Sequence, residues 1–534
     1  MRPGRRRARA AALAALLLAA CAPACTPQAS GELRILAGSE LADLEPLLER
    51  AEQETGVQVR MDYTGTLEGV QQVVSGQAAQ GYDAIWFSSN RYLALHPEGR
   101  GALGDQTSVM ASPVVLGVAE HTAEDLGWTG GAEVTWADVA QAAAGGDLSY
   151  GMTSPAASNS GFSALVGVAA ALSDSGSALQ AADVAEAAPD LERFFSGQHL
   201  TAGSSGWLAD AYVRRATGQD PGPELNAMVN YESVLLSVQQ REELPEPLVL
   251  VHPADGAVTA DYPLTLLDAA GGQAAERYDA LVSYLMGEEA QEEIERTTHR
   301  RPMAPGAAAP GLPALAELPF PATAEVADGL IGAYFDEYRP PARTVFVLDS
   351  SGSMAGERMA ALRTAVDTLT GGDGDALDVR FQRFYHRERV TLLPFASAVH
   401  RPRTFEVDGG APEGALEGIR AGVRALEPDG WTAGYAALAE AYGLLAEEEA
   451  GGRFTSIVLL TDGAVNRGPD LAEFREEVHA GLDAELRGVP VFPVLLGESD
   501  AAEMEELAGL TGGRVFDARS TSLDEAFREI RGYQ

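Results

Sequence analysis

A chain of 534 residues is too long for a single hydrophobic core, so two or three domains are expected. Apolar residues make up 46% of the chain and charged residues 22%, which is typical of a soluble globular protein. Acidic residues outnumber basic ones by 78 to 38, and every basic residue is arginine. A formal charge of −40 would repel nucleic acid and anionic lipid, which disfavours both as partners, and we expect no nucleic-acid binding.

The N-terminus predicts export. Five arginines within residues 1–9 precede an apolar stretch over 10–20, which is too short to cross a bilayer and reads as a signal peptide. The signal, residues 1–20, ends in Leu-Ala-Ala before Cys21, and this resembles the bacterial lipobox, whose cysteine is acylated after cleavage. We therefore expect residues 21–30 to tether an exported lipoprotein to the outer face of the cytoplasmic membrane, as its only membrane contact. A plain secretory signal with an incidental cysteine is the alternative.

Strands and a helix alternate at the start of the next region. Strands are expected at 33–37, 57–61 and 82–87 and a helix at 41–55, which predicts a mostly parallel sheet with helices on both faces. In such α/β folds, ligands bind beyond the carboxyl ends of the strands. Small polar residues follow those ends, although loops are commonly polar in any case. The candidate ligand-binding residues here are Ser39, Thr64, Ser88, Ser89 and Asn90.

Several stretches in order resemble the bacterial extracellular solute-binding proteins of the two-lobed, periplasmic-binding type. They include GELRILAGSELADLEPLLERAEQETGVQV, YDAIWFSSN, SPVVLGVAE, MTSPAASNSGFSAL, NYESVLLSV, HPADGAVTADYPLTLL and YLMGEEAQEEI. The resemblance covers residues 31–305, about half of the chain. It implies two lobes joined by crossing strands near 112–119 and 261–266, with a small molecule or peptide enclosed between them by a hinge motion.

Further candidate ligand residues lie in the second part of this region. Ser158, Asn159 and Ser160 precede an apolar helix whose N-terminus could hold an anionic or polar group, or the serines could simply cap that helix. Tyr231 and Glu232 could form a hydrogen-bonding pair in the cleft, or begin a solvated helix. The cleft loops contain few basic residues apart from Arg91, which disfavours phosphate or sulfate as the ligand.

Residues 306–341 are rich in proline and alanine, which predicts a semi-rigid linker. A helix is expected at 322–338 and could pack on either neighbouring domain. From 342 to the end, strands are expected at 344–348, 389–394, 456–460, 489–496 and 515–516. Helices are expected at 357–369, 415–426, 435–447, 501–510 and 522–531. The apolar strands predict a doubly wound, Rossmann-like α/β domain with a ligand site at its carboxyl strand ends.

Oxygen-bearing side chains follow three of those strands. They are Asp349, Ser351 and Ser353 in the stretch DSSGSM, Thr432 in GWT, and Asp462 in TDG. Hard oxygen donors without sulfur or imidazole suit Mg²⁺, or else Mn²⁺ or Ca²⁺. The five positions resemble the metal-ion-dependent adhesion site of the von Willebrand factor A (VWA) family, apart from Trp431, where a glycine is common.

The resemblance implies a metal touched by the Ser351 and Ser353 hydroxyls, with Thr432 joining when a ligand is engaged and the two aspartates acting mostly through water. One coordination position would stay open for an acidic residue of a partner protein. Three polar turns that cap helices are the alternative interpretation.

The sequence predicts no enzyme, because HExxH, G-x-S-x-G and G-x-x-x-x-G-K patterns are absent. We therefore expect an α/β surface lipoprotein that joins a two-lobed solute-binding module to a VWA domain with Mg²⁺-dependent protein binding. Two alternatives stay open: the binding component of an ABC transporter with an accessory VWA domain, and a metal-dependent assembly factor.

Overall fold

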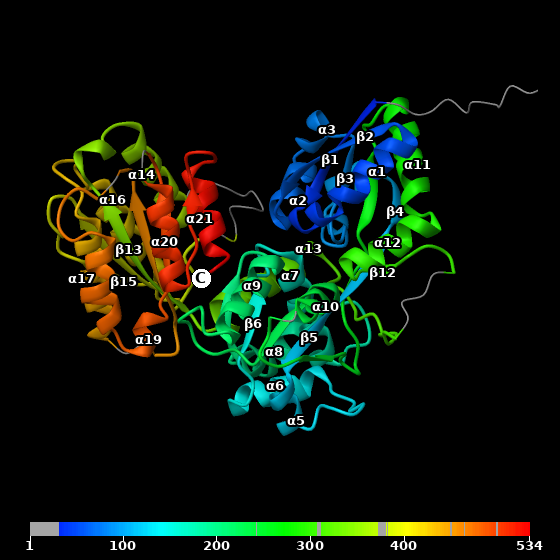
Figure 1. Cartoon of the computed structure of the whole chain (residues 1–534), viewed down its shortest axis with the longest axis horizontal. Helices are drawn as coiled ribbons and strands as arrows, with labels where there is room; N and C mark the ends of the chain where they lie inside the picture. Colours follow the sequence, from blue (N-terminus) through cyan, green and yellow to red (C-terminus); the bar gives the residue numbers. More distant parts are fainter. Residues whose placement is uncertain are drawn as a thin grey trace, which may run out of the picture.

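The structure is a computed structural model that describes residues 31–241, 243–306, 311–371, 381, 383–448, 451–463, 465–497 and 500–534. Each of three bodies is built around one β-sheet (Figure 1). We call them the first lobe, the second lobe and the C-terminal domain. Cys21 lies outside the described residues. Within the described ranges, no helix has the length and apolar character needed to cross a membrane.

The first lobe has a five-stranded sheet in the order β2-β1-β3-β11-β4. The first three of these strands are parallel, as the sequence predicts, and β11 is antiparallel to its neighbours. The strands are β1 (Gly31–Gly38), β2 (Val57–Thr64), β3 (Ala84–Trp86), β4 (Leu103–Ser108) and β11 (Pro263–Leu267). The helical segments are η1 (Ser39–Leu44), α1 (Glu45–Thr55), α2 (Thr66–Val74), α3 (Ala78–Gly81), η2 (Leu93–Leu95), α4 (Pro97–Ala102), α11 (Gly272–Leu285) and α12 (Glu288–Thr298). The helix expected at 41–55 is split into η1 and α1, because Pro46 fits only the first turn of a helix.

The second lobe has a sheet in the order β10-β5-β8-β6-β7, and β9 and β12 also pair with β5. The strands are β5 (Met110–Ala119), β6 (Tyr150–Thr153), β7 (Gln198–Ala202), β8 (Ala227–Tyr231), β9 (Leu248–Val251), β10 (Thr259–Ala260) and β12 (Arg301–Pro302). The helices are α5 (Glu120–Asp125), α6 (Trp136–Gly145), α7 (Asn159–Ser173), α8 (Ala181–Phe195), α9 (Ser205–Ala216) and α10 (Glu232–Gln240). The chain crosses between the lobes from β4 to β5 and from β10 to β11, near the two predicted crossings.

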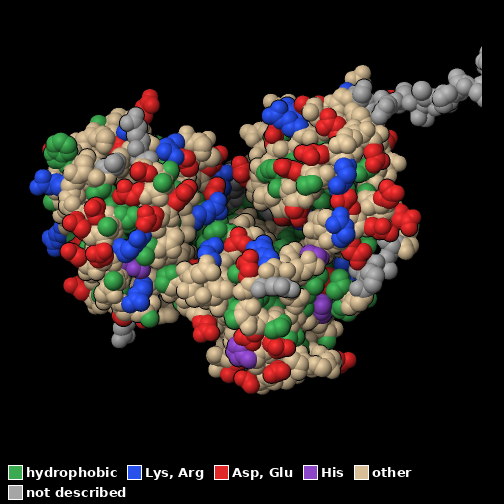
Figure 2. Space-filling view, viewed as in Figure 1, with side chains coloured by type: hydrophobic (Ala, Val, Ile, Leu, Met, Phe, Trp, Pro, Cys, Tyr) green, Lys and Arg blue, Asp and Glu red, His purple; other side chains and the backbone are tan. Residues whose placement is uncertain are grey.

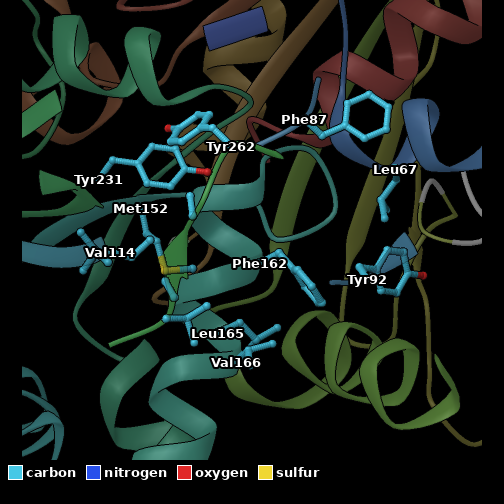
Figure 3. Packing of buried hydrophobic residues seen from close by; sticks show 14 of the residues in the cluster. Leu67, Phe87, Tyr92, Val114, Met152, Phe162, Leu165, Val166, Tyr231 and Tyr262 are labelled. Carbon is cyan, nitrogen blue, oxygen red and sulfur yellow. The ribbon is translucent and has the colours of Figure 1, made fainter. Parts of the chain in front are cut away.

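The two lobes share an apolar cluster (Figure 3). The ring of Phe162 in α7 stands edge-on to Tyr92 of the first lobe, with 5.2 Å between the ring centroids. Tyr231 at the end of β8 lies 6.2 Å from Tyr262, which precedes β11. The two lobes are therefore in direct contact through these aromatic side chains.

The C-terminal domain has a six-stranded sheet in the order β15-β14-β13-β16-β17-β18. All pairs are parallel except β14 with β15, so the predicted doubly wound fold is confirmed. The strands are β13 (Ala342–Asp349), β14 (Arg389–Phe395), β15 (Arg403–Glu406), β16 (Phe454–Thr461), β17 (Val491–Leu495) and β18 (Phe516–Asp517). The sequence does not predict β15, because this exposed edge strand, Arg-Thr-Phe-Glu, has no apolar run.

The expected helices of this domain are present as α14 (Glu357–Leu369), α16 (Pro412–Arg424), α17 (Gly434–Ala446), α20 (Ala501–Thr511) and α21 (Leu523–Arg531). Four short segments were not expected: α18 (Leu471–Glu473), η5 (Phe474–Val478), η6 (His479–Gly481) and α19 (Ala484–Arg487). The short turn η4 (Gly352–Met354) lies within the stretch DSSGSM.

The helix expected at 322–338 packs on both of its neighbours. It consists of α13 (Ala324–Ala333) and one π-helical turn, η3 (Tyr334–Tyr338). Tyr334 stands edge-on to Phe195 of α8 at 5.0 Å, and Phe335 stacks on Tyr385 of the C-terminal domain at 4.4 Å. This part of the connector is therefore a packed element between two bodies.

A buried ion network fixes the same junction. The Arg339 guanidinium donates to Glu388 at 3.2 Å and to a main-chain oxygen of Gln534 at 2.8 Å. Arg531, at the end of α21, donates to both Glu388 oxygens at 2.8 and 3.1 Å. Burial of these charges is tolerated because each has a partner.

The second lobe contacts the C-terminal domain directly. Residues of α9 share a buried apolar cluster with β13, α14 and α21. The loop after α9 lies against the end of α19, where a Cβ built on Gly488 would come 2.8 Å from the carbonyl oxygen of Pro221. The C-terminal domain is thus held by side-chain packing as well as by the connector.

Replacement of Arg339 by methionine should lower the unfolding free energy of the C-terminal domain by about 3–5 kcal/mol, because Glu388 would lose one of its two buried cations. Chemical denaturation of the full chain measures this loss. Arg60→Met is the matched control, since the Arg60 side chain is 60% exposed and its pair with Asp62 spans 3.6 Å. Equal stability of the two variants would contradict the importance of the network.

Candidate functional site

The five predicted metal residues lie on three loops at one edge of the C-terminal sheet. Asp349 ends β13 and Thr461 ends β16, and these two parallel strands are adjacent in the sheet. After β13 the chain continues to β14 on one side of the pair, and after β16 it continues to β17 on the other side. This is the topological switch point at which doubly wound folds bind ligands. The third loop joins the first through a hydrogen bond of 3.1 Å from the Gly352 amide to the Gly430 carbonyl.

Side chains from two of these loops form a continuous chain of hydrogen bonds. The Ser351 and Ser353 hydroxyls are 3.0 Å apart, and Ser353 donates to Asp462 Oδ1 at 2.7 Å. Asp349 accepts the Ser351 amide at 2.7 Å and the Thr461 hydroxyl at 3.0 Å. The structure therefore brings four of the five predicted residues into one cluster of hydroxyl and carboxylate oxygens.

Thr432, the fifth predicted residue, is buried on the third loop. Its amide donates to the Asn466 side chain at 2.9 Å, and the Asn466 amide donates to its carbonyl at 3.1 Å. These two bonds attach the Thr432 loop to the segment after Asp462. Within the described residues, no group of three or more His, Cys, Asp or Glu side chains is arranged for a metal, and this cluster combines two carboxylates with hydroxyls.

The Asp349 carboxyl is fully buried. Burial raises its pKa above the usual range, and the nearby Asp462 carboxylate adds to this, while hydrogen bonds from Ser351 and Thr461 oppose it. A cation at this edge of the sheet would therefore stabilise a buried carboxylate.

Arg358, in the first turn of α14, was not predicted as part of the cluster. Its guanidinium donates to Asp462 Oδ2 and, at 3.1 Å, to the carbonyl of Ser353. Asp462 is thus engaged by Ser353 on one oxygen and by an arginine on the other. A positive charge from the protein itself already lies against the candidate metal site.

Trp431 is exposed next to this cluster, with 62% of its surface accessible. Its amide donates to the Ser397 hydroxyl at 2.8 Å. The preceding Gly430 has φ +83°, a conformation that side chains disfavour, and a Cβ there would lie 2.5 Å from the same hydroxyl. Glycine is therefore required for the turn that presents Trp431 and Thr432.

Some of the residues predicted to bind the solute line a cavity, and the others make contacts inside the protein. A cavity of about 390 Å³ lies where the three bodies meet, and Ser39 and Thr64 line it. In Figure 2 this region is a hollow with basic side chains around it. Several other candidates contact one another instead: Ser158 and Ser160 hydroxyls are 3.1 Å apart, and Asn159 donates to the Tyr231 hydroxyl at 3.0 Å.

The polar residues that follow β3 are used within the first lobe. Asn90 donates to Gln106 at 3.0 Å and to Thr265 at 2.8 Å. Ser88 accepts the Tyr262 amide at 3.0 Å through its carbonyl, and the Ser89 hydroxyl accepts the Arg91 amide at 3.3 Å. These contacts hold the loop that follows β3, and none of the three predicted residues lines the cavity.

Glu232 is buried in an ion cluster outside the cavity. Arg301 donates to both of its oxygens at 2.6 and 2.7 Å, and His252 lies 2.6 Å from one of them. Burial would raise the pKa of Glu232, but hydrogen bonds from Arg301 and His252 outweigh burial and hold it below the usual range. This cluster joins α10 to β12 and so ties together two parts of the second lobe.

Family comparison agrees with this geometry. The family model described as bacterial extracellular solute-binding protein matches residues 33–297, and that of the von Willebrand factor type A domain matches 344–464. The chain joins a bacterial extracellular solute-binding protein to a VWA domain. All five predicted metal residues lie within the VWA match, and neither match is to a catalytic family. The first match, to extracellular proteins, agrees with an exported chain.

Solved structures similar to this protein include periplasmic binding proteins and a von Willebrand factor type A protein. The periplasmic binding protein AfuA from Actinobacillus pleuropneumoniae, with fructose-6-phosphate bound, is 13% identical, with a TM-score of 0.44 over 58% of this chain and 98% of its own. Iron-bound HitA from Pseudomonas aeruginosa is 14% identical, with a TM-score of 0.43 over 56% and 98%. A von Willebrand factor type A protein from Catenulispora acidiphila is 20% identical, with a TM-score of 0.28 over 36% and 42%. No curated protein matches the chain.

The sequence did not identify the residues of the C-terminal domain that line this cavity. Arg514, Arg528, Glu529 and Tyr533 lie on or near α21, beyond the end of the VWA family match. The second lobe adds Ser154, directly after β6, and Ser204, two residues after β7, to the cavity wall. The two serines could have been found by extending the strand-end argument to β6 and β7, but no sequence pattern relates α21 to the cleft.

Gly430→Ala should destabilise the VWA domain by about 1–3 kcal/mol and displace the loop with Trp431 and Thr432, because alanine is strained at positive φ and its Cβ would meet Ser397. Thermal unfolding and tryptophan fluorescence measure the two effects. Gly443→Ala on α17 is the matched control, since a Cβ there meets open space and alanine favours a helix by about 1 kcal/mol. Similar unfolding temperatures for both variants would contradict the strain argument.

Proposed function

We propose that the protein is an exported, lipid-anchored receptor that captures a small molecule or peptide in its solute-binding module and binds a partner protein through Mg²⁺ in its VWA domain. The observation that carries the proposal is the cluster of Asp349, Ser351, Ser353 and Asp462 at the switch point of the C-terminal sheet, with Thr432 on an adjoining loop. The lipobox-like sequence at Cys21 supports the anchor.

The donor set fits Mg²⁺. This ion prefers hard oxygen ligands and is commonly held by one or two carboxylates while it keeps several waters. Ser351, Ser353 and Thr432 offer hydroxyls, and the buried Asp349 and Asp462 offer the negative charge. With only two carboxylates, a bound Mg²⁺ would supply an open position with residual positive charge to an acidic side chain of the partner.

The surroundings of the cluster suit a protein partner. Trp431 is exposed beside the site, and exposed tryptophans and arginines are enriched among residues that dominate protein–protein binding energies. The overall charge of −40 would repel an acidic partner at long range, so a cation between the two acidic surfaces would also reduce that repulsion.

Arg358 should compete with the metal. Its guanidinium already neutralises Asp462, so a divalent cation must act on a carboxylate that has a cationic neighbour. The affinity for Mg²⁺ should accordingly be moderate and sensitive to this residue.

Mg²⁺ or Mn²⁺ should raise the unfolding temperature of the full chain, because a ligand that binds only the native state stabilises it. Asp349→Ala should abolish the shift, since it removes a buried carboxylate of the site. Differential scanning calorimetry in the presence of each metal and of EDTA measures the effect. An unaltered chain that is indifferent to both metals and to EDTA would contradict the proposal.

Arg358→Gln should increase the metal-induced rise in unfolding temperature, whereas Asp349→Ala should abolish it. Loss of the competing cation should tighten Mg²⁺ binding by about tenfold, which corresponds to about 1.4 kcal/mol. Arg296→Gln, on a side chain that is 71% exposed in α12, should leave the affinity unchanged.

The solute-capture part of the proposal is tested by native mass spectrometry of the freshly purified full chain. A retained small molecule or peptide is expected as a discrete mass addition that disappears on denaturation. Preparations that never carry such an addition, together with no response to a broad solute library, would contradict solute capture and leave the metal prediction in place.

A further inference from the structure

The VWA domain supplies one wall of the solute cavity. The first lobe contributes the carboxyl ends of β1 and β2, at Ser39 and Thr64. The second lobe contributes Ser154 after β6 and Ser204 after β7. The remaining wall comes largely from α21 and the residues after it, so the strand ends where a solute is expected face a helix of the other module.

The end of the chain lies directly on the second lobe. A Cβ built on Gly532 would be 3.0 Å from the Cβ of Ala157 and 3.1 Å from the Cα of Gly203. The next residue, Tyr533, is buried and stands edge-on to Trp207 of α9, with 4.8 Å between the rings. The loops before α7 and α9, which line the cavity, are thus packed against the last residues of the VWA domain.

Three arginines of the VWA domain line the cavity, and one of them, Arg531, is already bound by Glu388. Arg528 lies 3.7 Å from Glu68 of the first lobe, and Arg514 lies 3.8 Å from Glu529. Arg514 also donates to the Tyr533 hydroxyl. A guanidinium has five N–H donors, so Arg514 and Arg528 can each bind a solute oxyanion while they stay near their glutamates.

The opposite wall has a buried donor without a partner. The hydroxyl of Ser154 is buried and has no hydrogen-bond partner among the residues that the structure describes. It lies on the loop that leads into α7, a helix of 15 residues whose N-cap, Ser158, makes no side-chain capping bond. The N-terminus of such a helix carries partial positive charge, which favours an anion at this wall.

We propose that the solute carries an anionic oxygen group, a carboxylate or a phosphate, which is bound between the Ser154 loop of the second lobe and Arg514 and Arg528 of the VWA domain. The solute site is then shared by both modules, and solute binding fixes the VWA domain over the cleft. This inference rests on the solute-capture part of the proposed function. It reverses the expectation, based on the cleft loops alone, that phosphate is disfavoured.

The test is isothermal titration of the full chain with inorganic phosphate and, separately, with succinate, in EDTA and at constant ionic strength. Saturable binding of at least one anion at millimolar concentration is expected, and the anion that binds identifies phosphate or carboxylate as the group. Arg514→Gln or Arg528→Gln should weaken that binding about tenfold or more, as expected for loss of a charged hydrogen bond. Arg296→Gln, on an exposed helix of the first lobe, should bind as the unaltered chain does.

The proposal is overturned if neither anion binds, or if both cavity variants bind it as tightly as the unaltered chain. Circular dichroism of each variant verifies that it is folded. Because EDTA removes divalent metal, failure of this test leaves the Mg²⁺ proposal untouched. A retained solute whose occupancy is unaffected by both arginine variants would support solute capture while overturning this inference.

Discussion

The arrangement of the three bodies depends on the buried network of Arg339, Glu388 and Arg531. A guanidinium enclosed by the rings of Tyr334 and Phe335 is stable only if a carboxylate accompanies it. Since Glu388 immediately precedes β14 and Arg531 ends α21, the two ion pairs orient the last helix relative to both the sheet and the connector. The residues after α21 are thereby placed over the second lobe.

Helix α14 contacts both functional regions. It begins three residues after the last residue of the stretch DSSGSM, and Arg358 in its first turn binds Asp462. Further along, Thr368 donates to Asp524 of α21 at 3.3 Å, so the helix that starts beside the proposed metal site packs on the helix that lines the cavity. Two sites are coupled when the ligands of both change the position of one shared structural element. The packed pair of helices α14 and α21 is such a candidate element, because α14 contacts the Asp462 cluster and α21 lines the cavity.

The two proposed sites differ in charge: the metal site contains carboxylates, and the cavity wall contains arginines. The chain has 78 acidic and 38 basic residues, an excess of negative charge that suits the divalent cation proposed for Asp349 and Asp462. The cavity between the bodies instead has Arg514 and Arg528 in its wall, each beside a glutamate. In a chain with a net charge of −40, such a local concentration of guanidinium groups is where an anionic solute would be stabilised.

The sequence by itself determined the two α/β modules and the cluster of oxygen-bearing residues at the proposed metal site. Apolar runs and their alternation with helices depend on local spacing, and Asp349, Ser351, Ser353 and Asp462 follow strands that a parallel sheet must bring to one edge. Only the tertiary structure decided which strand-end residues face a cavity: Ser39 and Thr64 do, whereas Asn90 and Glu232 are used by internal partners. It also decided that α21 closes the cleft. That contact joins segments more than three hundred residues apart, such as Glu68 and Arg528, and it depends on how whole surfaces pack, which periodicity and spacing along the chain do not encode.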